Sequence, residues 1–333
     1  MDAPSSQPLP LATSLLPPGT CRSKNEFGEI GIDAELIVGA DEELFEMNNG
    51  CICCTVRGDL IRTLHTLLAG NAARARPFDA IIVETTDLAD PGPVAQTFFV
   101  DALLASKTRL DSITTVVDAR HIGLRLADSR EAAAQIAFVD QIVLNKTDLV
   151  SAGELDHIEA RLRRINPLAP IHRARRADVA LTEVLERGGF DLERIEGLEP
   201  GFSAHDEAGH AHHEHCGHDP YDHAHDAQIQ SVCLSSTAPM DGAAVSEWLT
   251  ALVAEQGANI LRAKGIVGIH GEPRRMVFQA VHMLLEGELQ RPWKAGEARS
   301  SRLVFIGRHL DAPALQTGFD GCAAVENAGP ENL

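Results

Sequence analysis

The sequence predicts an α/β domain with a parallel sheet, followed by a smaller α+β domain. Three short, almost wholly apolar segments each end in polar residues, and helix-like stretches separate them, as in buried parallel strands alternating with helices. At 333 residues the chain is long enough for two domains. The predicted parts are a disordered leader at 1–24, the α/β domain at 25–198, a mobile linker at 199–227, the second domain at 228–325 and a tail at 326–333.

The elements of the first domain follow from the spacing of apolar residues. The stretch RGDLIRTLHTLLAG places leucines at helical spacing, and Gly70 can end that helix. The predicted strands are 80–86, 112–119 and 141–148, and PVAQTFFVDALLA and AGELDHIEARLRRI are predicted helices. Ligands bind at the carboxyl ends of strands in such sheets. Those ends here are ETTD, DARH and NKTD.

The second domain is predicted from apolar runs of strand length. These runs are QIQSVCLSS, NILRAKGIVGI, RRMVFQAVHML and RSSRLVFIGRHL, with a helix near 241–256. Strands around one or two helices indicate a small α+β domain.

Composition excludes several classes of function. The formal net charge of −19 opposes binding to nucleic-acid phosphates and attracts cations. The first residues lack the basic-then-apolar order of a signal peptide, and no apolar run reaches the roughly 18 residues of a membrane span. The seven cysteines are too unevenly spaced for a secreted disulfide framework. We expect a cytoplasmic protein with no nucleic-acid or membrane partner, and the sequence leaves a homo-oligomer open.

The strand end NKTD matches a guanine-reading N-K-x-D loop. The Asp148 carboxylate can accept hydrogen bonds from the ring and exocyclic N–H groups of guanine, whereas adenine presents the wrong edge. Asn145 and Lys146 would brace the loop, with the lysine stem along the base. The alternative interpretation is a polar strand end chosen for turn formation, because so short a motif also matches by chance.

Glu84 ends the first predicted strand, in ETTD. In a phosphate-binding loop protein, a carboxylate at this place can act through water on Mg²⁺. A solvated strand end is the alternative interpretation. The phosphate-cradling motif G-x-x-x-x-G-K-[ST], which would supply backbone N–H groups, a lysine and a hydroxyl, occurs nowhere in the sequence.

Three cysteines, Cys51, Cys53 and Cys54, follow Asn-Asn-Gly directly before the first predicted helix. A redox pair would use C-x-x-C, but Cys53 intrudes into it. Buried free cysteines are the second alternative, although a preceding turn favours the surface. Thiolates near a helix N-terminus suit a cation such as Zn²⁺, and we favour this interpretation. Only two or three thiols can reach one ion, and Glu29 is the nearest further ligand by sequence.

The predicted linker contains eight of the fifteen histidines and cannot build a core. Neutral imidazoles in a mobile chain bind Zn²⁺, Co²⁺, Ni²⁺ and Cu²⁺ with little discrimination. A solvated linker without function is the alternative, and we favour capture or buffering of metal. The auxiliary ligands are His205, His210, His212, His213, His215, Cys216, His218, His223 and His225.

The sequence closely resembles the CobW-type family of P-loop GTPases in NEFGEIGIDAEL, NNGCICCTVRGDL, IIVETTDLADPGPV, TVVDARH, QIVLNKTDL, the histidine tract and LRAKGIVGI…RRMVFQAVHMLL…SRLVFIGRHLD, from residue 25 to about 325. Members of this family are metal-insertion chaperones, some of them serving cobalamin biosynthesis. The resemblance implies a P-loop-NTPase-like sheet and a CobW C-terminal domain. It also implies GTP-dependent delivery of zinc, or alternatively cobalt, to a client metalloprotein.

The resemblance also assigns roles to residues. The matching positions are Cys51, Cys53 and Cys54 for the metal motif, Asn145, Lys146 and Asp148 for the guanine motif, and Glu84 for the Walker-B-like glutamate. Glu26 and Glu29 lie in the switch-like segment that would couple nucleotide state to the metal site. The implied partners are the client and GTP, with Mg²⁺ if the nucleotide site is functional.

Two departures from the family are visible. Family members begin with a βαβ unit that carries the P-loop, so we expect the sheet to lack its first βαβ unit, including its central strand. Asp87 replaces a glycine, and its carboxylate would repel a γ-phosphate. For the chain as written we therefore expect weak or no GTP turnover. Either the start codon is misplaced, or the chain is a paralogue deficient in hydrolysis that binds and buffers zinc.

Overall fold

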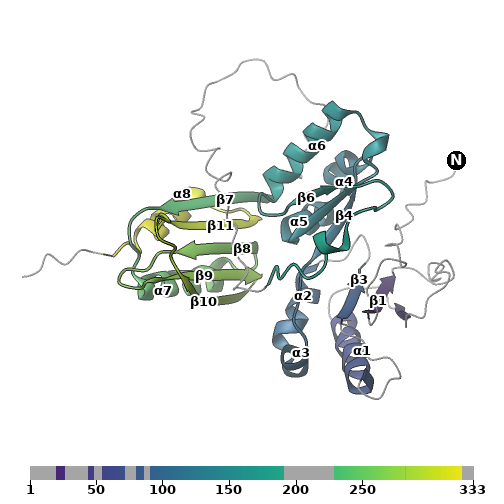
Figure 1. Cartoon of the computed structure of the whole chain (residues 1–333), viewed down its shortest axis with the longest axis horizontal. Helices are drawn as coiled ribbons and strands as arrows, with labels where there is room; N and C mark the ends of the chain where they lie inside the picture. The colour runs from purple at the N-terminus through teal and green to yellow at the C-terminus, as the bar shows by residue number, and fades with distance from the viewer. Residues whose placement is uncertain are drawn as a thin grey trace, which may run out of the picture. The chain divides into compact units, whose positions relative to one another are not determined.

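A computed structural model of the chain describes residues 20–26, 44–48, 55–71, 80–85, 91–190, 229–281 and 283–324 (Figure 1). The chain divides into two compact units. The first comprises Met1–Arg125, Gln141–Glu159 and Pro170–Arg187, and the second comprises Leu126–Asp140, Ala160–Ala169 and Gly188–Leu333.

The first unit contains parallel strands in two sheets. Its described strands are β1 (Thr20–Glu26), β2 (Leu44–Asn48), β3 (Ala80–Glu84), β4 (Thr114–Asp118), β5 (Gln141–Asn145) and β6 (Ile171–Arg173). The orders are β2-β1-β3 and β4-β5-β6, with every neighbouring pair parallel. The prediction of a parallel α/β sheet is thus confirmed. Among the described strands, β3 and β4 are not hydrogen-bonded to each other. The absence of a central strand between them stays a prediction.

Strand β1 corrects one prediction made from the sequence. The disordered leader was expected to run to residue 24, but β1 begins at Thr20 and pairs with β2 on one side and β3 on the other. Its sequence, TCRSKNE, has no apolar run. Backbone N–H and C=O groups supply the ladder whatever the side chains are, so the composition of this segment concealed the strand.

Between residues 55 and 165, the three predicted helical stretches are helical in the structure, and two further helices, α4 and α5, were not predicted individually. They are α1 (Thr55–Asn71), α2 (Pro91–Val100), α3 (Ala102–Lys107), α4 (Ile122–Asp128), α5 (Arg130–Phe138) and α6 (Ala152–Ile165). The single helix predicted for PVAQTFFVDALLA is broken between α2 and α3. Asp101 causes the break because its carboxylate accepts hydrogen bonds from the N–H groups of Leu103 and Leu104 and so caps α3.

Helix α1 is held by the leucines that predicted it. Leu60, Leu64 and Leu67 are each at most 1% exposed and pack with apolar residues of α2, α3 and β3. Each such buried leucine contributes about 2–5 kcal/mol relative to alanine. The helix that follows the three cysteines is therefore firmly anchored to the first sheet.

The second unit contains an antiparallel five-stranded sheet in the order β10-β9-β8-β11-β7 (Figure 1). Its elements after residue 228 are β7 (Ile229–Ser236), α7 (Gly242–Gln256), β8 (Ile260–Val267), β9 (Arg274–Val281), β10 (Leu284–Pro292), β11 (Ser301–Arg308) and α8 (Ala312–Asp320). The predicted α+β domain is confirmed. Strand β10, which pairs with β9 at the sheet edge, was not predicted because LLEGELQRP contains no apolar run of strand length.

One face of this sheet forms an apolar core with α7 and α8. Ala263 and Val267 of β8 and Phe278 of β9 belong to that core. Gly265 lies between them in the strand, and a Cβ there would fall 2.2 Å from an atom of the Phe278 ring. Only glycine fits at this position.

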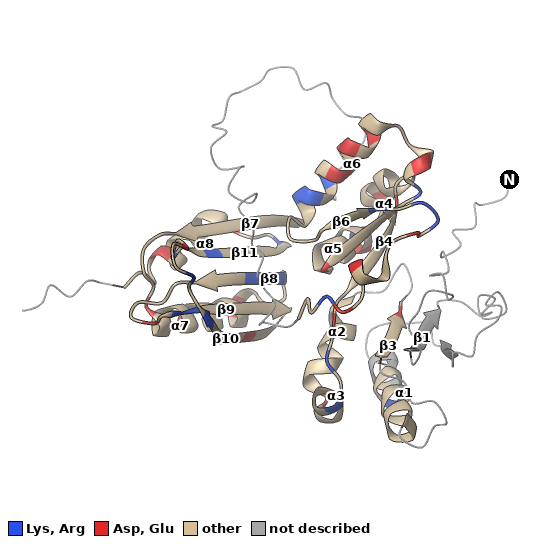
Figure 2. Ribbon diagram, viewed as in Figure 1, with Lys and Arg blue, Asp and Glu red and all other residues tan. Residues whose placement is uncertain are grey.

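The other face of the sheet carries a buried charge cluster. Because side chains alternate along a strand, Arg262 and Lys264 of β8 point away from the apolar core. Figure 2 shows the basic part of β8 in blue. Both residues donate hydrogen bonds to one carboxylate oxygen of Asp140, and Lys264 also donates to the carbonyl of Gly189. The Phe190 ring lies 4.1 Å from the Arg262 guanidinium carbon. Two cations thus share one buried carboxylate.

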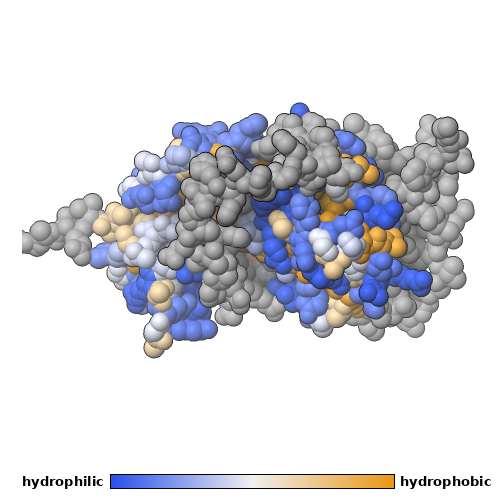
Figure 3. Space-filling model, turned by 90° about the horizontal axis from the view of Figure 1, so that it is seen from above, coloured by the Kyte–Doolittle hydropathy of each residue, from blue (hydrophilic) through white to orange (hydrophobic). Residues whose placement is uncertain are grey.

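Hydrophilic residues cover much of the visible described surface in Figure 3, with hydrophobic residues gathered in a limited region. Within the part of the chain that the structure describes, every helix is too short or too polar to span a membrane.

Candidate nucleotide and metal site

The carboxyl ends of β4 and β5 bring the predicted guanine motif together with residues of the preceding strand. The two strands are parallel, and Asp118 is the register partner of Asn145. The Ala119 N–H donates to the Asn145 carbonyl over 2.9 Å. Val117 and Leu144 are almost fully buried and fix the two strand ends. Polar side chains therefore converge where a parallel sheet binds ligands.

The buried side chain of Asn145 connects the guanine loop to the segment after β6. This side chain is fully buried, and its Oδ1 accepts a hydrogen bond of 2.8 Å from the Ala177 N–H. Thr147 adds a second link, because its hydroxyl donates to the Ala174 carbonyl over 3.0 Å. The segment after β6 is therefore hydrogen-bonded to this loop through Asn145 and Thr147.

Lys146 adopts a left-handed backbone conformation, and its side chain points toward β4. Its φ of 58° is unusual for a residue other than glycine. Its ammonium donates a hydrogen bond of 2.7 Å to Asp118 Oδ2. His121 Nδ1 lies 3.0 Å from the same oxygen, and the Arg120 N–H donates to Oδ1 over 2.9 Å. The Asp118 carboxylate thus interacts with the Lys146 ammonium, the His121 ring and the Arg120 backbone N–H.

The carboxylate of Asp118 is ionised in this arrangement. Partial burial acts to raise its pKa, but hydrogen bonds from Lys146 and His121 outweigh that effect and hold the pKa of Asp118 below its usual range. The lysine therefore faces a negative charge at neutral pH.

Asp148 lies in the short 3₁₀ turn Thr147–Leu149 and is exposed. Its carboxylate makes no hydrogen bond to another residue of the described chain. An exposed, uncommitted carboxylate next to a braced asparagine can accept two N–H groups of a guanine edge. Asn145, Lys146 and Asp148 therefore lie together at the carboxyl end of β5, and their role in base recognition stays a prediction.

Glu84 lies at the end of β3, opposite Lys24 of β1. Among the described strands, β3 and β5 belong to different sheets. The Mg²⁺-linked role of Glu84 stays a prediction.

The predicted metal ligands lie outside the described residues. These are Cys51, Cys53, Cys54, Glu29 and the auxiliary histidines with Cys216. The cysteine motif falls between the end of β2 at Asn48 and the start of α1 at Thr55. Elsewhere in the described ranges, no group of three His, Cys, Asp or Glu side chains is placed to hold a metal ion.

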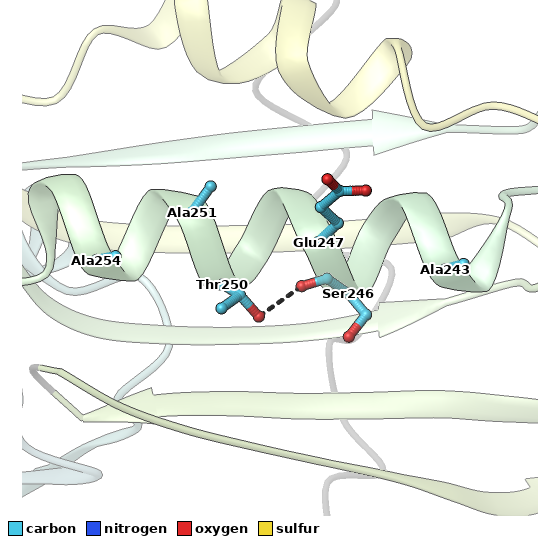
Figure 4. A pocket seen from close by; sticks show the side chains of 6 residues that line it. All are labelled: Ala243, Ser246, Glu247, Thr250, Ala251 and Ala254. Carbon is cyan, nitrogen blue, oxygen red and sulfur yellow. Dashed lines mark hydrogen bonds between the residues drawn. The ribbon is translucent and has the colours of Figure 1, made fainter.

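A shallow hollow on α7 offers less chemistry. It is lined by Ala243, Ser246, Glu247, Thr250, Ala251 and Ala254 (Figure 4). The Thr250 hydroxyl already donates to the Ser246 carbonyl of its own helix. One carboxylate among small residues provides no convergent set of polar groups, so we assign this hollow no function.

Sequence reasoning missed Asp118, His121 and Ala177 as neighbours of the guanine motif. The strand end DARH contained a signal for the first two, because carboxyl ends of adjacent parallel strands meet at one edge. Ala177 contributes a backbone N–H, for which the side-chain sequence offers no signal.

Comparison with known proteins agrees with these observations. The chain matches the CobW/HypB/UreG nucleotide-binding domain over residues 24–173 and the cobalamin synthesis protein cobW C-terminal domain over residues 229–323. It is 33% identical over 299 residues to the zinc chaperone YjiA of Escherichia coli (strain K12), covering 90% of this chain and 88% of that protein. The zinc chaperone CobW of Sinorhizobium sp is 31% identical over 329 residues, with 89% and 86% covered.

Solved structures show the same fold. A zinc-bound triple mutant of the YjiA GTPase aligns with a TM-score of 0.69 at 28% sequence identity, covering 92% of this chain and 90% of that one. The zinc-bound YjiA GTPase from E. coli aligns with a TM-score of 0.67 at 26% identity, covering 93% and 100%. The chain therefore belongs to the CobW family, with its nucleotide-binding domain followed by its C-terminal domain.

Proposed function

We propose that this chain is a guanine-nucleotide-dependent metallochaperone, which binds zinc at its cysteine motif and delivers it to a client metalloprotein. The observation that carries the proposal is the N-K-x-D segment at the end of the buried strand β5, where Asn145 is buried, Lys146 is hydrogen-bonded to Asp118 and Asp148 is exposed. Relatives that cover most of this chain are named zinc chaperones, which supports zinc as the cargo.

Cys51, Cys53 and Cys54 are the proposed zinc ligands, with Glu29 completing the set. Zinc favours four ligands in tetrahedral geometry, and thiolates are among its preferred donors. The histidines of residues 205–225 would collect the ion and pass it to the cysteines. Cobalt suits the imidazole donors too and stays the alternative cargo.

GTP with Mg²⁺ is the proposed nucleotide. Asp148 would select guanine, and Glu84 would act through water on Mg²⁺ near the phosphates. Zinc affinity would then depend on the nucleotide, because ligands that share a conformational equilibrium change each other's binding.

A second candidate is a zinc-buffering protein without GTP hydrolysis. The observation that favours it is the lack of a G-x-x-x-x-G-K-[ST] motif in the printed sequence. Robust GTP turnover by the purified chain, abolished by Asp148→Ala, would exclude this candidate. Turnover that is weak or undetectable is the result we expect for the chain as written.

Equilibrium titration with fluorescent GTP and ATP analogues tests the nucleotide half of the proposal. The chain should bind the guanine analogue, and Asp148→Asn should weaken that binding by about tenfold to a hundredfold, because hydrogen bonds to a charged group contribute about 1.5–3 kcal/mol. Asp156→Asn, which alters an exposed carboxylate on α6, is the control and should bind normally. Equal affinity for the two nucleotides would contradict the proposal.

A further inference from the structure

Asp118 connects the two strand ends at the nucleotide site through different oxygens. Oδ1 accepts the Arg120 N–H at 2.9 Å, which holds the turn after β4. Oδ2 reaches across to β5 and accepts from the Lys146 ammonium at 2.7 Å, with His121 3.0 Å away. One oxygen therefore shapes its own loop, while the other holds a residue of the guanine motif.

The backbone conformation of Lys146 requires contacts that stabilise it. Its φ of 58° lies in the left-handed region, which a non-glycine residue adopts only when its surroundings fix it. The Arg120 guanidinium supplies a second link from the β4 side, because it donates to the Leu149 carbonyl over 3.2 Å. The Leu149 N–H in turn donates to the Lys146 carbonyl over 3.0 Å. The end of β4 and the turn after it thus contact the guanine loop at both of its ends, Lys146 and Leu149.

We propose that Asp118 is a positioning residue for guanine-nucleotide binding: it fixes the Lys146 side chain so that the lysine stem lies ready to contact the base. This inference rests on the proposed nucleotide-binding function. A lysine with four rotatable bonds loses conformational entropy when a ligand orders it. Asp118 removes that loss in advance, because the ammonium is already held.

The test compares Asp118→Asn, Lys146→Met and the double variant by titration with a fluorescent GDP analogue. Asparagine keeps an oxygen for the Arg120 N–H, so Asp118→Asn removes mainly the charge that holds Lys146. Its affinity should fall about tenfold, the equivalent of ordering one or two side-chain groups. In the Lys146→Met background the same substitution should change affinity less than about twofold, because Asp118 acts through the lysine. Asp156→Asn removes another ion-paired carboxylate and is the matched control.

A nucleotide-free measurement tests the contact between Asp118 and Lys146 directly in the folded chain. The rate at which an amine-reactive ester acylates Lys146, read by mass spectrometry, should rise in Asp118→Asn and stay constant in Asp156→Asn. Thermal unfolding of each variant establishes that the comparison is between folded chains.

The outcomes separate this inference from the proposed function. Binding of GDP by the wild type with equal affinity in Asp118→Asn would overturn the inference alone. Additive losses in the double variant would also overturn it, because they would mean that Asp118 acts independently of Lys146. A wild-type chain that binds no guanine nucleotide would overturn the proposed function and this inference together.

Discussion

At the scale of single residues, carboxylates at strand ends organise both halves of the chain. Asp118 is the last residue of β4 and accepts a hydrogen bond from Lys146, whereas Asp140 precedes β5 and accepts hydrogen bonds from Arg262 and Lys264. The first pair is partly exposed, and the second cluster is almost fully buried. Their expected energetic roles differ accordingly. An exposed pair contributes little to folding stability, but a buried carboxylate shared by two cations cannot be removed cheaply.

We predict that Asp140→Asn lowers the free energy of unfolding by about 3–5 kcal/mol, because two buried cations lose their counter-charge. Urea denaturation of the full chain measures the change. Asp128→Asn, at an exposed carboxylate shortly before Asp140, should stay within about 0.5 kcal/mol of the wild type.

A second variant identifies the cause. Lys264→Met in the Asp140→Asn background should restore part of the loss, since it removes one of the unpaired cations. A loss of less than about 1 kcal/mol for Asp140→Asn alone would contradict a structural role for this cluster.

The candidate site could be predicted in part from single residues. Asn145, Lys146 and Asp148 were identified from their spacing after an apolar strand, and the structure places them in one loop. The contacts of Asn145 with Ala177 and of Lys146 with Asp118 span 32 and 28 positions of sequence. Such contacts depend on strand register, which a local pattern does not encode.

At the scale of elements, the spacing of apolar residues predicted the helices and strands that bury apolar side chains. It missed the strands whose sequences are mixed or polar. The leucines of α1 repeat at helical spacing, and β5 is buried along its whole length. Strands β1 and β10 have mixed or polar sequences and depend on backbone pairing with their neighbours. The break between α2 and α3 depends on one capping aspartate, whose effect an apolar pattern does not reveal.

The connection from β10 to β11 should respond to pH through Glu297. This carboxylate accepts two hydrogen bonds from the Arg291 guanidinium and one from the Lys294 N–H. The Arg291 hydrogen bond, followed by that of the Lys294 backbone, lowers the pKa of Glu297 from 4.5 to about 2. Because the folded pKa is depressed, the stabilisation is complete above pH 4.5 and is lost as the pH falls toward about 2.

The matching experiment compares the free energy of unfolding of the wild type and Glu297→Gln across that pH range. The difference should be constant above pH 4.5 and shrink steadily below it. Glu255→Gln, at an exposed position of α7, should show no such trend. A difference that is independent of pH would mean that the ionised carboxylate is not what stabilises this connection.

At the scale of the whole molecule, the chain joins a nucleotide-binding domain and a C-terminal domain of the CobW family. In the proposed function, the nucleotide bound at the guanine loop controls the affinity of the cysteine motif for one metal ion. Such coupling is reciprocal, so a nucleotide that changes zinc affinity must itself bind with changed affinity when zinc is present. Nucleotide identity should matter, because the role proposed for Asp148 is to select guanine over adenine.

The most direct test measures zinc affinity at Cys51, Cys53 and Cys54 in a variant that lacks residues 205–225, so that the histidines do not contribute. Adding GTP should change the zinc dissociation constant by about fivefold or more, the usual range for coupled sites, whereas ATP should not change it. Asp148→Asn should abolish the effect of GTP. A zinc dissociation constant that is the same with GTP, with ATP and without nucleotide would contradict the account.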